Sequence, residues 1–196
     1  MYHTVIIGTQ VWMVENLKTT KYRDGSAIPN VTDDDTWGSL RTGAYCNFGN
    51  DDAIGGTKYG KLYNWDAVND SRNIAPTGWH VPTMDEWYTL TDYLYANYGT
   101  FGSKALASKT DWASSTNANA GAVGNDLTKN NTTGFTALPG GYRNHYGTYN
   151  DSGYYGYWWS SSDGGYRYLL YYGSYVGKDF SYYGKVYGYS VRCVKD

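Results

Sequence analysis

The sequence predicts an α+β protein in which short antiparallel strands and tight turns predominate over helices. The chain has 196 residues, enough for one generous domain with a real core, and we treat residues 1–196 as a single domain. Its hydrophobic fraction of 41% relies on 8 Trp and 24 Tyr residues, and glycine is abundant at 25 residues. Because aromatic residues favour strands and glycine favours turns, this composition is not typical of a helical bundle.

The first part of the chain is predicted to contain a β-hairpin followed by loops. Residues 4–14 form two short strand-like segments around a turn at Gly8. A polar stretch follows, with a turn at residues 24–26 and an exposed acidic cluster at residues 33–35. Residues 49–56 are again predicted to be a loop.

Two helices are predicted in the middle of the chain. Residues 60–68 place three apolar side chains, the first of them Leu62, at helical spacing, which predicts a short amphipathic helix. A second helix is predicted over residues 82–94, because Thr83 and Glu86 can form a capping box before an apolar run.

The remainder of the chain is predicted to consist of loops and a meander of strands. Residues 104–108 suggest one helical turn, and residues 117–131 suggest a long loop. Beyond Phe135, aromatic and small residues alternate between frequent glycines, which predicts short strands joined by tight turns. Residues 189–194 alternate between two faces and are predicted to form a closing strand.

Charge and hydropathy exclude several classes of partner. The formal net charge of −2 and the pI near 5.9 give no basic footprint, so we predict no nucleic-acid partner. No apolar stretch approaches the roughly 18 to 20 residues of a membrane span, so we predict no membrane insertion. The first residues do not resemble a secretory signal. We expect the protein at the cell surface or outside the cell, with its signal absent from this sequence, or in a virion.

Histidine, cysteine and serine match no catalytic motif. The three histidines form no metal-binding pattern; His80 is expected to pack against the start of the helix and His145 to be exposed. Cys46 and Cys193 could form one long-range disulfide or stay reduced and buried. We favour free thiols, because two cysteines are too few for a disulfide-dependent fold. We therefore predict that the protein is not an enzyme.

Acidic residues have ordinary structural explanations. The clusters at residues 33–35 and 51–52 are typical of solvated turns, and Asp85 and Glu86 suit the positive end of a helix dipole. The oxygen-rich loop at residues 47–52 could supply calcium ligands, but it lacks EF-hand spacing. We predict no metal and no cofactor.

Tyrosine dominates the last quarter of the chain. From Tyr142 to Asp196, 15 of 55 residues are tyrosine, interleaved with Gly, Ser, Asn and Asp, whereas Glu, Gln and Met are absent. Antibody paratopes have a similar composition, because a rigid ring with a hydroxyl gives a large contact area at small entropic cost. Tyrosine is also a strong strand former, so composition alone favours a half-buried sheet.

Several long motifs occur in a fixed order along almost the whole chain. They are IGTQVWM and ENLK within residues 7–18, TGAYC at 42–46, YGKLYNW at 59–65, GWHVP at 78–82, GFTALPGGYR at 134–143, WWSS at 158–161 and SVRCVKD at 190–196. With these motifs the chain resembles the Fibrobacter succinogenes major paralogous domain (FISUMP) family.

The resemblance implies the C-type lectin-like fold. In that fold the N- and C-terminal strands pair, two helices flank the sheets, and a long looped region displays the binding face. The fold also includes formylglycine-generating enzymes and related oxygenases, which need a close cysteine pair or a histidine triad. Classical lectins of the fold use a calcium site signalled by Glu-Pro-Asn or Gln-Pro-Asp followed by Trp-Asn-Asp. This chain departs from all of these patterns.

The resemblance also suggests how the tyrosines could arise. Diversity-generating retroelements mutate proteins that display C-type lectin-like domains, by copying a template and randomising its adenines. An Asn codon can then become Tyr, Ser, Asp, Gly, His, Val, Leu, Phe and others, but never Glu, Gln, Lys, Met or Trp. Such residues alternate here with apparent framework positions, which are Gly156, Trp158, Trp159, Arg167, Lys178, Lys185, Gly188 and Arg192. This pattern permits a scaffold at residues 1–133 and a variable ligand-binding region at residues 134–196.

We therefore predict a noncatalytic ligand-binding or receptor-binding module that displays a tyrosine-rich surface to a protein or glycan on another cell or molecule. We expect the framework tryptophans to lie mostly in the core. These residues are Trp12, Trp65, Trp79, Trp87, Trp158 and Trp159. The contact residues are expected to come from His145, Tyr146, Tyr149, Tyr154, Tyr155, Tyr166, Tyr168, Tyr171, Tyr172, Tyr175, Asp179, Phe180, Tyr182, Tyr183 and Tyr187.

Two alternatives stay open at this point. The first is a carbohydrate-binding surface module or adhesin, because aromatic platforms suit pyranose faces as well as protein. The second is an oxygenase of the formylglycine-generating-enzyme branch, which stoichiometric binding of copper or iron through His or Cys would support.

Overall fold

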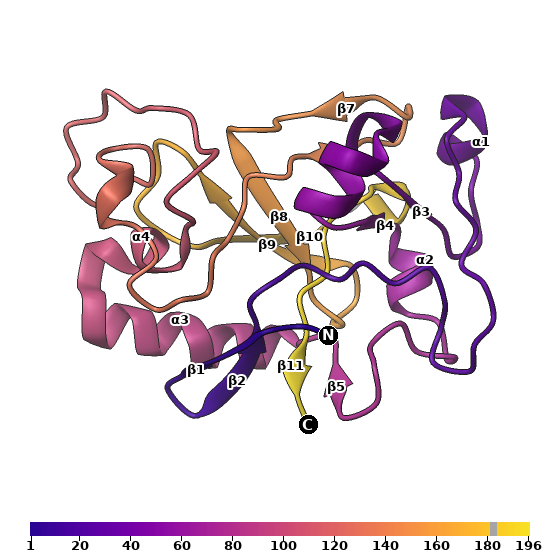
Figure 1. Cartoon of the computed structure of the whole chain (residues 1–196), viewed down its shortest axis with the longest axis horizontal. Helices are drawn as coiled ribbons and strands as arrows, with labels where there is room; N and C mark the ends of the chain where they lie inside the picture. Colours follow the sequence, from indigo (N-terminus) through magenta and orange to yellow (C-terminus); the bar gives the residue numbers. More distant parts are fainter. Residues whose placement is uncertain (181–183) are drawn as a thin grey trace.

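The computed structural model describes residues 1–180 and 184–196, and it joins the two ends of the chain in one sheet (Figure 1). This sheet has the order β1-β2-β11-β5, formed by β1 (Thr4–Ile7), β2 (Gln10–Met13), β11 (Val194–Lys195) and β5 (Trp79–His80). The predicted N-terminal hairpin is confirmed as β1 and β2, and Gly8 supplies the positive φ of +61° that their turn needs.

The predicted capped helix is α3 (Met84–Tyr98), and its capping box is present. The Thr83 side chain accepts a hydrogen bond from the N–H of Glu86, and the Glu86 carboxylate accepts one from the N–H of Thr83 at 2.8 Å. The buried face of α3 carries the three predicted apolar residues, Trp87, Leu90 and Leu94. In the described part of the chain, no helix is long and apolar enough to cross a membrane.

The helix predicted over residues 60–68 is only half correct. Leu62 lies in a strand, β4 (Leu62–Tyr63), which pairs with β3 (Tyr45–Cys46). The helix α2 (Trp65–Val68) begins later, because the side chain of Asn64 caps its N-terminus and accepts a backbone N–H there. The i, i+3 spacing of apolar residues therefore spans a strand and a helix, and Leu62 packs in a different hydrophobic cluster from Trp65 and Val68.

Two segments predicted as turns and loops contain helical turns. The acidic cluster begins α1 (Asp34–Gly38), and the Asp33 carboxylate caps it. The segment predicted as a loop contains a 3-10 turn (Phe48–Asn50) and a π-helical turn (Asp52–Lys58), the second capped by the Asp51 carboxylate. In both places the acidic residues satisfy the free N–H groups of a helix start.

The predicted helical turn after α3 is confirmed, with a small shift. A 3-10 turn (Gly99–Phe101) leads into α4 (Gly102–Leu106), which starts two residues earlier than predicted. The long loop that follows contains one 3-10 turn (Leu127–Lys129). The buried Lys104 of α4 holds this loop, because its Nζ donates to the carbonyl of Ala122 at 3.1 Å and to a neighbouring carbonyl.

The tyrosine-rich region forms the predicted meander of short strands. Its main sheet has the antiparallel order β10-β9-β8, with β8 (Tyr155–Trp159), β9 (Gly165–Leu170) and β10 (Gly177–Phe180). A smaller hairpin of β6 (Tyr142–Arg143) and β7 (Tyr149–Asn150) precedes it. In Figure 1, α3 and α4 lie at one end of the molecule and α1 and α2 at the other, with the main sheet between them.

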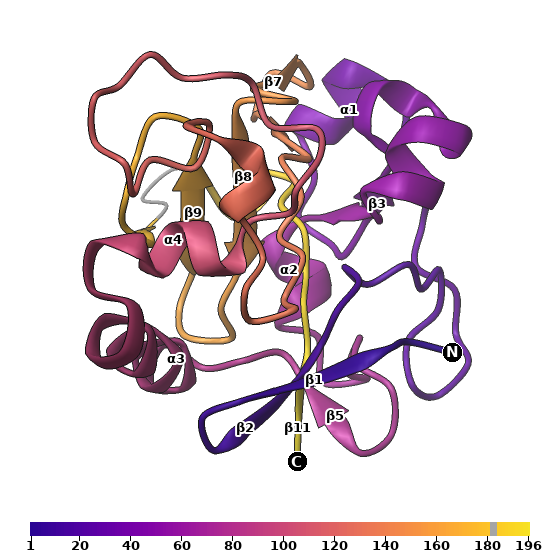
Figure 2. The same ribbon diagram turned by 60° about the vertical axis from the view of Figure 1, so that its left-hand side comes forward.

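The predicted closing strand at residues 189–194 is not one continuous strand. The chain is extended there, with single bridges from Tyr189 to Tyr63 and from Ser190 to Trp158, and only its end forms β11. The residues on both of its faces are buried, because the segment runs through the interior and not along a surface. Figure 2 shows it crossing the molecule towards the C-terminus between α2 and the main sheet.

Neighbouring tryptophans of β8 point into two different cores. Trp158 packs in a cluster with Trp12 and Trp87 of β2 and α3, and Trp159 packs in a second cluster with Trp65 of α2. This follows from strand alternation, which sends adjacent side chains to opposite faces. All of the framework tryptophans are buried as predicted, except Trp79, which is half-buried at the edge of β5.

A buried polar hub holds the two cores together. The Oδ1 of Asn16 accepts hydrogen bonds from Trp158 Nε1 at 2.9 Å and from Arg192 Nη2 at 2.7 Å. Its Nδ2 donates to the carbonyl of Tyr59 at 2.8 Å. The guanidinium of Arg192 also donates to the carbonyl of Phe135 and stacks on that ring. These contacts satisfy polar groups that would otherwise be costly to bury.

Candidate functional site

A hollow lined by phenol rings opens on one face of the β8-β9-β10 sheet. Its volume is about 240 Å³. We call it the tyrosine trough, and its lining residues are Tyr155, Tyr157, Tyr166, Tyr168, Leu170, Tyr172, Tyr175 and Asp179. The trough therefore combines six phenols with one aliphatic side chain and one carboxylate.

Strand alternation and register bring these residues together. Tyr155 and Tyr157 are two apart on β8 and therefore share a face, as do Tyr166 and Tyr168 on β9. The register sets Tyr157 opposite Tyr168 and Asp179 of β10 opposite Tyr166. The sequence folds this way locally because aromatic residues at every second position suit a pleated, half-buried surface.

The rings that line the trough are the outer part of an aromatic cluster whose inner part is buried in the core. Trp159, the next residue on this face of β8, is fully buried, with its ring centroid 4.5 Å from that of Tyr189. Tyr189 stacks on Tyr157 at 5.2 Å, and Tyr157 stacks on Tyr155 at 5.6 Å. The inner rings are anchored in the core, so the outer rings are held in place before any ligand arrives.

A glycine gives one ring of the trough its position. Gly177 lies opposite Tyr168 in the sheet, and the Tyr168 ring covers the place where a Cβ would be. An aromatic ring that covers a cross-strand glycine protects the backbone and fixes the ring. Tyr168 therefore lies flat against β10 and forms part of the floor of the trough.

The pKa values of four trough phenols, Tyr155, Tyr157, Tyr166 and Tyr168, are raised, so these groups remain neutral at physiological pH. Burial raises the pKa of Tyr157, and burial together with the charge of Asp179 raises the pKa of Tyr166 to about 12. The hydroxyls of Tyr155 and Tyr172 lie 3.3 Å apart and share a hydrogen bond. Neutral phenols can both donate and accept hydrogen bonds, so the trough can pair with either kind of ligand group.

Of the 15 residues predicted to supply contacts, six line the trough. They are Tyr155, Tyr166, Tyr168, Tyr172, Tyr175 and Asp179. Tyr182 and Tyr183 lie outside the described residues. The other seven residues lie elsewhere in the tyrosine-rich region, at three places.

His145, Tyr146 and Tyr187 form a separate corner beside the β6-β7 hairpin. His145 Nδ1 lies 3.2 Å from the hydroxyl of Tyr187, and its ring centroid is 3.8 Å from that of Tyr146. The prediction that His145 is exposed was wrong, because these two rings cover it and leave it half-buried. Tyr146 is exposed, at 73%.

Tyr154, Tyr171 and Phe180 lie beside the trough but do not line it. Tyr154 packs edge-on against Tyr171, with 5.2 Å between the ring centroids, and Tyr171 is half-buried against the main core. Phe180 is exposed, but strand alternation places it opposite Gly165, on the face that looks towards α3. These residues could extend a contact surface around the rim of the sheet.

Tyr149 belongs to the framework of the β6-β7 hairpin. Its hydroxyl donates to Oδ1 of Asn50 at 2.7 Å, and its ring packs against Phe48 with centroids 5.2 Å apart. The guanidinium of the buried Arg143 lies 4.9 Å from the centre of the same ring. The ring therefore holds the hairpin to the 3-10 turn before Asn50 and does not reach the trough.

Sequence reasoning missed two lining residues, Tyr157 and Leu170. The signal that could have found Tyr157 is its spacing, because it lies two residues from Tyr155 on one strand. Leu170 could have been found only with the register, which places it opposite Tyr155. Tyr142 and Tyr189 were also not among the predicted contact residues. Their rings pack against Tyr157 and hold it in place.

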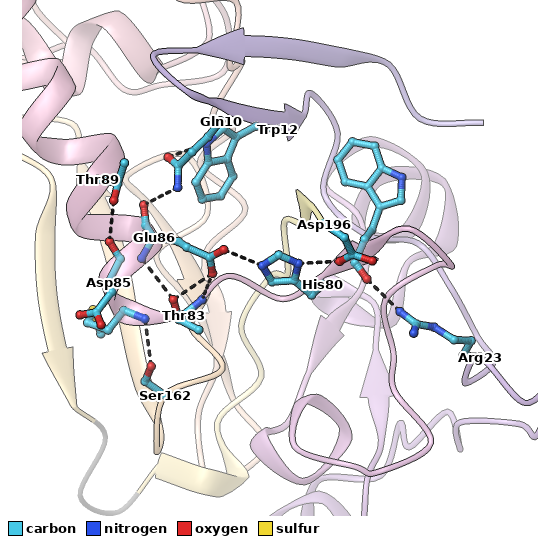
Figure 3. Close-up of polar contacts among 12 residues, drawn as sticks. Gln10, Trp12, Arg23, His80, Thr83, Asp85, Glu86, Thr89, Ser162 and Asp196 are labelled. Atoms are coloured by element: carbon cyan, nitrogen blue, oxygen red, sulfur yellow. Dashed lines mark hydrogen bonds and ion pairs between the residues drawn. The ribbon is translucent and has the colours of Figure 1, made fainter.

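A polar cluster lies at the start of α3, where His80 lies between two carboxylates (Figure 3). His80 Nε2 lies 2.7 Å from the Glu86 carboxylate, and His80 Nδ1 lies 2.7 Å from the Asp196 carboxylate. Burial alone would lower the pKa of His80, but its hydrogen bonds with Asp196 and Glu86 raise it. This confirms the predicted position of His80 at the helix start. His80 links the C-terminal strand to α3 through its contacts with Asp196 and Glu86, and we call this arrangement the clasp.

The two cysteines are free and buried, as favoured from the sequence. Cys46 and Cys193 lie in different hydrophobic clusters, and burial raises their pKa values to about 11 and about 12. Both thiols are therefore poor nucleophiles and poor metal ligands. Over residues 1–180 and 184–196, no group of three or more His, Cys, Asp or Glu side chains is placed to hold a metal ion.

Comparison with known proteins places the chain in one family. The sequence model described as the Fibrobacter succinogenes major domain matches residues 5–195, which is almost the whole chain. No curated protein and no solved structure gave a match. The match confirms the family that the motifs indicated, and the chain belongs to the Fibrobacter succinogenes major domain family.

Proposed function

We propose that this domain is a noncatalytic ligand-binding module whose contact surface is centred on the tyrosine trough. The observation that carries the proposal is a hollow lined by six phenols on a sheet whose inner aromatic residues are anchored in the core. Rigid rings bind with a small entropic cost, and their hydroxyls supply hydrogen bonds that orient the ligand. The domain would act at the cell surface, outside the cell or on a virion.

We further propose that the fold is C-type lectin-like and that the surface is diversified by a retroelement. The first idea is supported by the pairing of β2 with β11, which joins the two ends of the chain, and by the helix beside the sheets. The proposed diversification is supported by the difference in burial between the framework positions and the trough residues. Among the apparent framework positions, Gly156, Trp158, Trp159, Arg167, Gly188 and Arg192 are buried, whereas most trough residues are half-buried or exposed.

The gene neighbourhood tests the diversification directly. We expect a reverse transcriptase gene beside a near-copy of the segment that encodes residues 134–196, differing from it only at adenines. A neighbourhood without such a copy would refute the retroelement, although the trough could still bind an unchanging ligand.

Ligand arrays test the binding function. We expect the wild-type domain to bind at least one member of a purified protein array or a glycan array, and the triple variant Tyr155→Ser, Tyr172→Ser, Tyr175→Ser to lose that binding at least tenfold. The matched control is Phe101→Ser, because Phe101 is an exposed aromatic residue, at 44%, outside the trough. Equal loss in the control variant, or unchanged binding in the triple variant, would contradict the proposal.

A carbohydrate ligand is the second candidate, and one observation favours it. The trough places the carboxylate of Asp179 among flat aromatic faces, and carboxylates and phenols can hydrogen-bond to the hydroxyls of a pyranose that stacks on a ring. Binding to the glycan array alone, abolished by the same triple variant, would favour this candidate over a protein ligand.

A further inference from the structure

The tyrosine trough shares a wall with a second cavity that the framework of the domain builds. This cavity has a volume of about 380 Å³ and lies between the C-terminal half of α3, the turn before α4 and residues 174–176. Tyr175 lines both hollows. We call the second hollow the helix cavity, and its other side chains include Thr91, Asp92, Leu94, Tyr95, Ser174 and Val176.

Both hollows carry a carboxylate and no cation. Asp179 in the trough and Asp92 in the helix cavity are exposed, and neither lies within ion-pair distance of a Lys, Arg or His among the described residues. The lining residues of both hollows also include no Lys, Arg or His. On the α3 side of the sheet, Arg167 and Lys178 both lie over the ring of Tyr88, and the charge of Asp92 acts on the buried Arg167 without an ion pair between them.

The other surface hollows differ in this respect. A hollow between residues 27–43 and 66–72 contains Asp66 and Asp70, but also Arg41 and Arg72. A further hollow beside His145 combines Asp66 with Arg41 and Lys185. The carboxylates of those two hollows are therefore matched or outnumbered by cations, and among the hollows described here only the two that share Tyr175 have a carboxylate and no cation in their lining.

The ring faces add to the negative character of the two hollows. An aromatic ring has a negative face, and a cation over a tyrosine ring is stabilised by about 0.5–1 kcal/mol at exposed sites. Tyr175 is 58% exposed and Tyr95 is 79% exposed, so their faces are available to a ligand. A cation that enters either hollow would meet a carboxylate and at least one free aromatic face.

We propose that the tyrosine trough and the helix cavity together bind a polypeptide that presents two cationic side chains, lysine or arginine, one to Asp179 and the other to Asp92. This inference rests on the proposed ligand-binding function and adds the class of ligand. A polypeptide fits better than one small molecule, because the two carboxylates lie in separate hollows and one chain can place a side chain in each. Two adjoining hollows with a shared wall suit neighbouring side chains of one chain.

The test uses two small probes that share an aliphatic side chain and differ in the terminal ammonium group. Nα-acetyl-lysine methylamide and its neutral counterpart Nα-acetyl-norleucine methylamide are titrated into the ¹⁵N-labelled domain, and backbone amide shifts are followed by NMR. We expect the lysine probe to bind in the millimolar range and to shift amides of both hollows, such as those of Tyr155 and Ser174. The norleucine probe should bind about tenfold more weakly, and added salt should weaken the lysine probe alone.

Two variants, each of which removes one carboxylate, show which hollow each part of the binding comes from. Asp179→Asn should weaken the shifts in the trough about tenfold and leave those in the helix cavity, and Asp92→Asn should have the reverse effect. The matched control is Asp35→Asn, because Asp35 is an exposed carboxylate of α1 that lines neither hollow. It should change neither set of shifts.

Several outcomes would overturn the inference. If the norleucine probe binds as tightly as the lysine probe, or if both asparagine variants keep full affinity, the hollows bind ligands but do not select cations. In that case the ligand-binding function stands and only the ligand class is wrong. If neither probe binds although the arrays reveal a ligand that the trough variants lose, the ligand is of another class, such as a neutral glycan.

Discussion

At the scale of single residues, the position of each trough ring depends on a few small contacts behind it. Tyr168 lies flat because Gly177 has no side chain, and Tyr157 is held by the stacked ring of Tyr189. Composition predicted an aromatic surface in this region, but it did not identify Tyr157 as part of it. The sequence could not predict that the ring of Tyr168 packs on Gly177, because that contact depends on the register of β9 with β10.

Replacing Gly177 with alanine should destabilise the domain by about 1–3 kcal/mol. The new Cβ would overlap the ring of Tyr168, which would have to leave its seat. Urea unfolding measures the change. The double variant Gly177→Ala, Tyr168→Ser should recover part of the lost stability, because it removes the overlap between the new Cβ and the ring. Additive losses in the double variant would show that the two side chains do not interact.

Replacing Asn16 with alanine should cost about 3–5 kcal/mol of the free energy of unfolding. The change removes the acceptor of Trp158 and Arg192, and it leaves a fully buried guanidinium with fewer partners. Chemical denaturation would detect this loss. Asn97→Ala is the matched control, because Asn97 is exposed and makes one local hydrogen bond, so it should cost less than about 1 kcal/mol. Similar losses in the two variants would contradict the role of the hub.

At the scale of elements, capping and alternation explain most of what the sequence revealed. The capping box at Thr83 predicted α3 correctly, because its signal is local to four residues. The strand at Leu62 was missed, because its partner is β3, and no local pattern shows which distant segment a strand will pair with. The clasp made by His80 was predicted only as packing, since Asp196 is far away in the sequence.

The clasp should make stability depend on pH. The pKa of His80 is raised in the folded state, so its stabilising effect is present below its ordinary value of 6.5 and is lost as the pH rises through the folded value. The pKa of Glu86 is lowered, so its own effect is lost as the pH falls below about 4.5. His80→Gln should therefore cost most near pH 5.5, about 0.5–1 kcal/mol, because the clasp is partly exposed.

Urea unfolding of the wild type and His80→Gln at pH 5.5 and pH 8.5 measures this effect. We expect the difference between the two proteins to shrink at the higher pH. A constant difference would mean that His80 acts through packing alone. Asp196→Asn should reproduce part of the effect, because it removes one of the two charged partners.

At the scale of the whole molecule, the domain has two large hydrophobic cores joined by β8 and a smaller cluster around Trp37, with the tyrosine trough at the open end of one of the large cores. The sequence predicted the fold class, the family and the aromatic character of the site. It did not predict the trough itself, because that hollow exists only where three strands and residues 171–175 meet. The helix cavity was also missed, since its residues come from segments that were read as scaffold and loop.

The central claim is that a replaceable recognition surface sits on a fixed framework. Saturation mutagenesis of displayed protein, scored by protease resistance, tests it most directly without a known ligand. Tyr155, Tyr172, Tyr175 and Asp179 should accept most residues with changes in stability within about 0.5 kcal/mol. The framework residues Trp158, Trp159 and Arg192 should accept almost none, because they are buried. Equal intolerance at the trough and framework positions would contradict the claim, because it would make the trough residues part of the core.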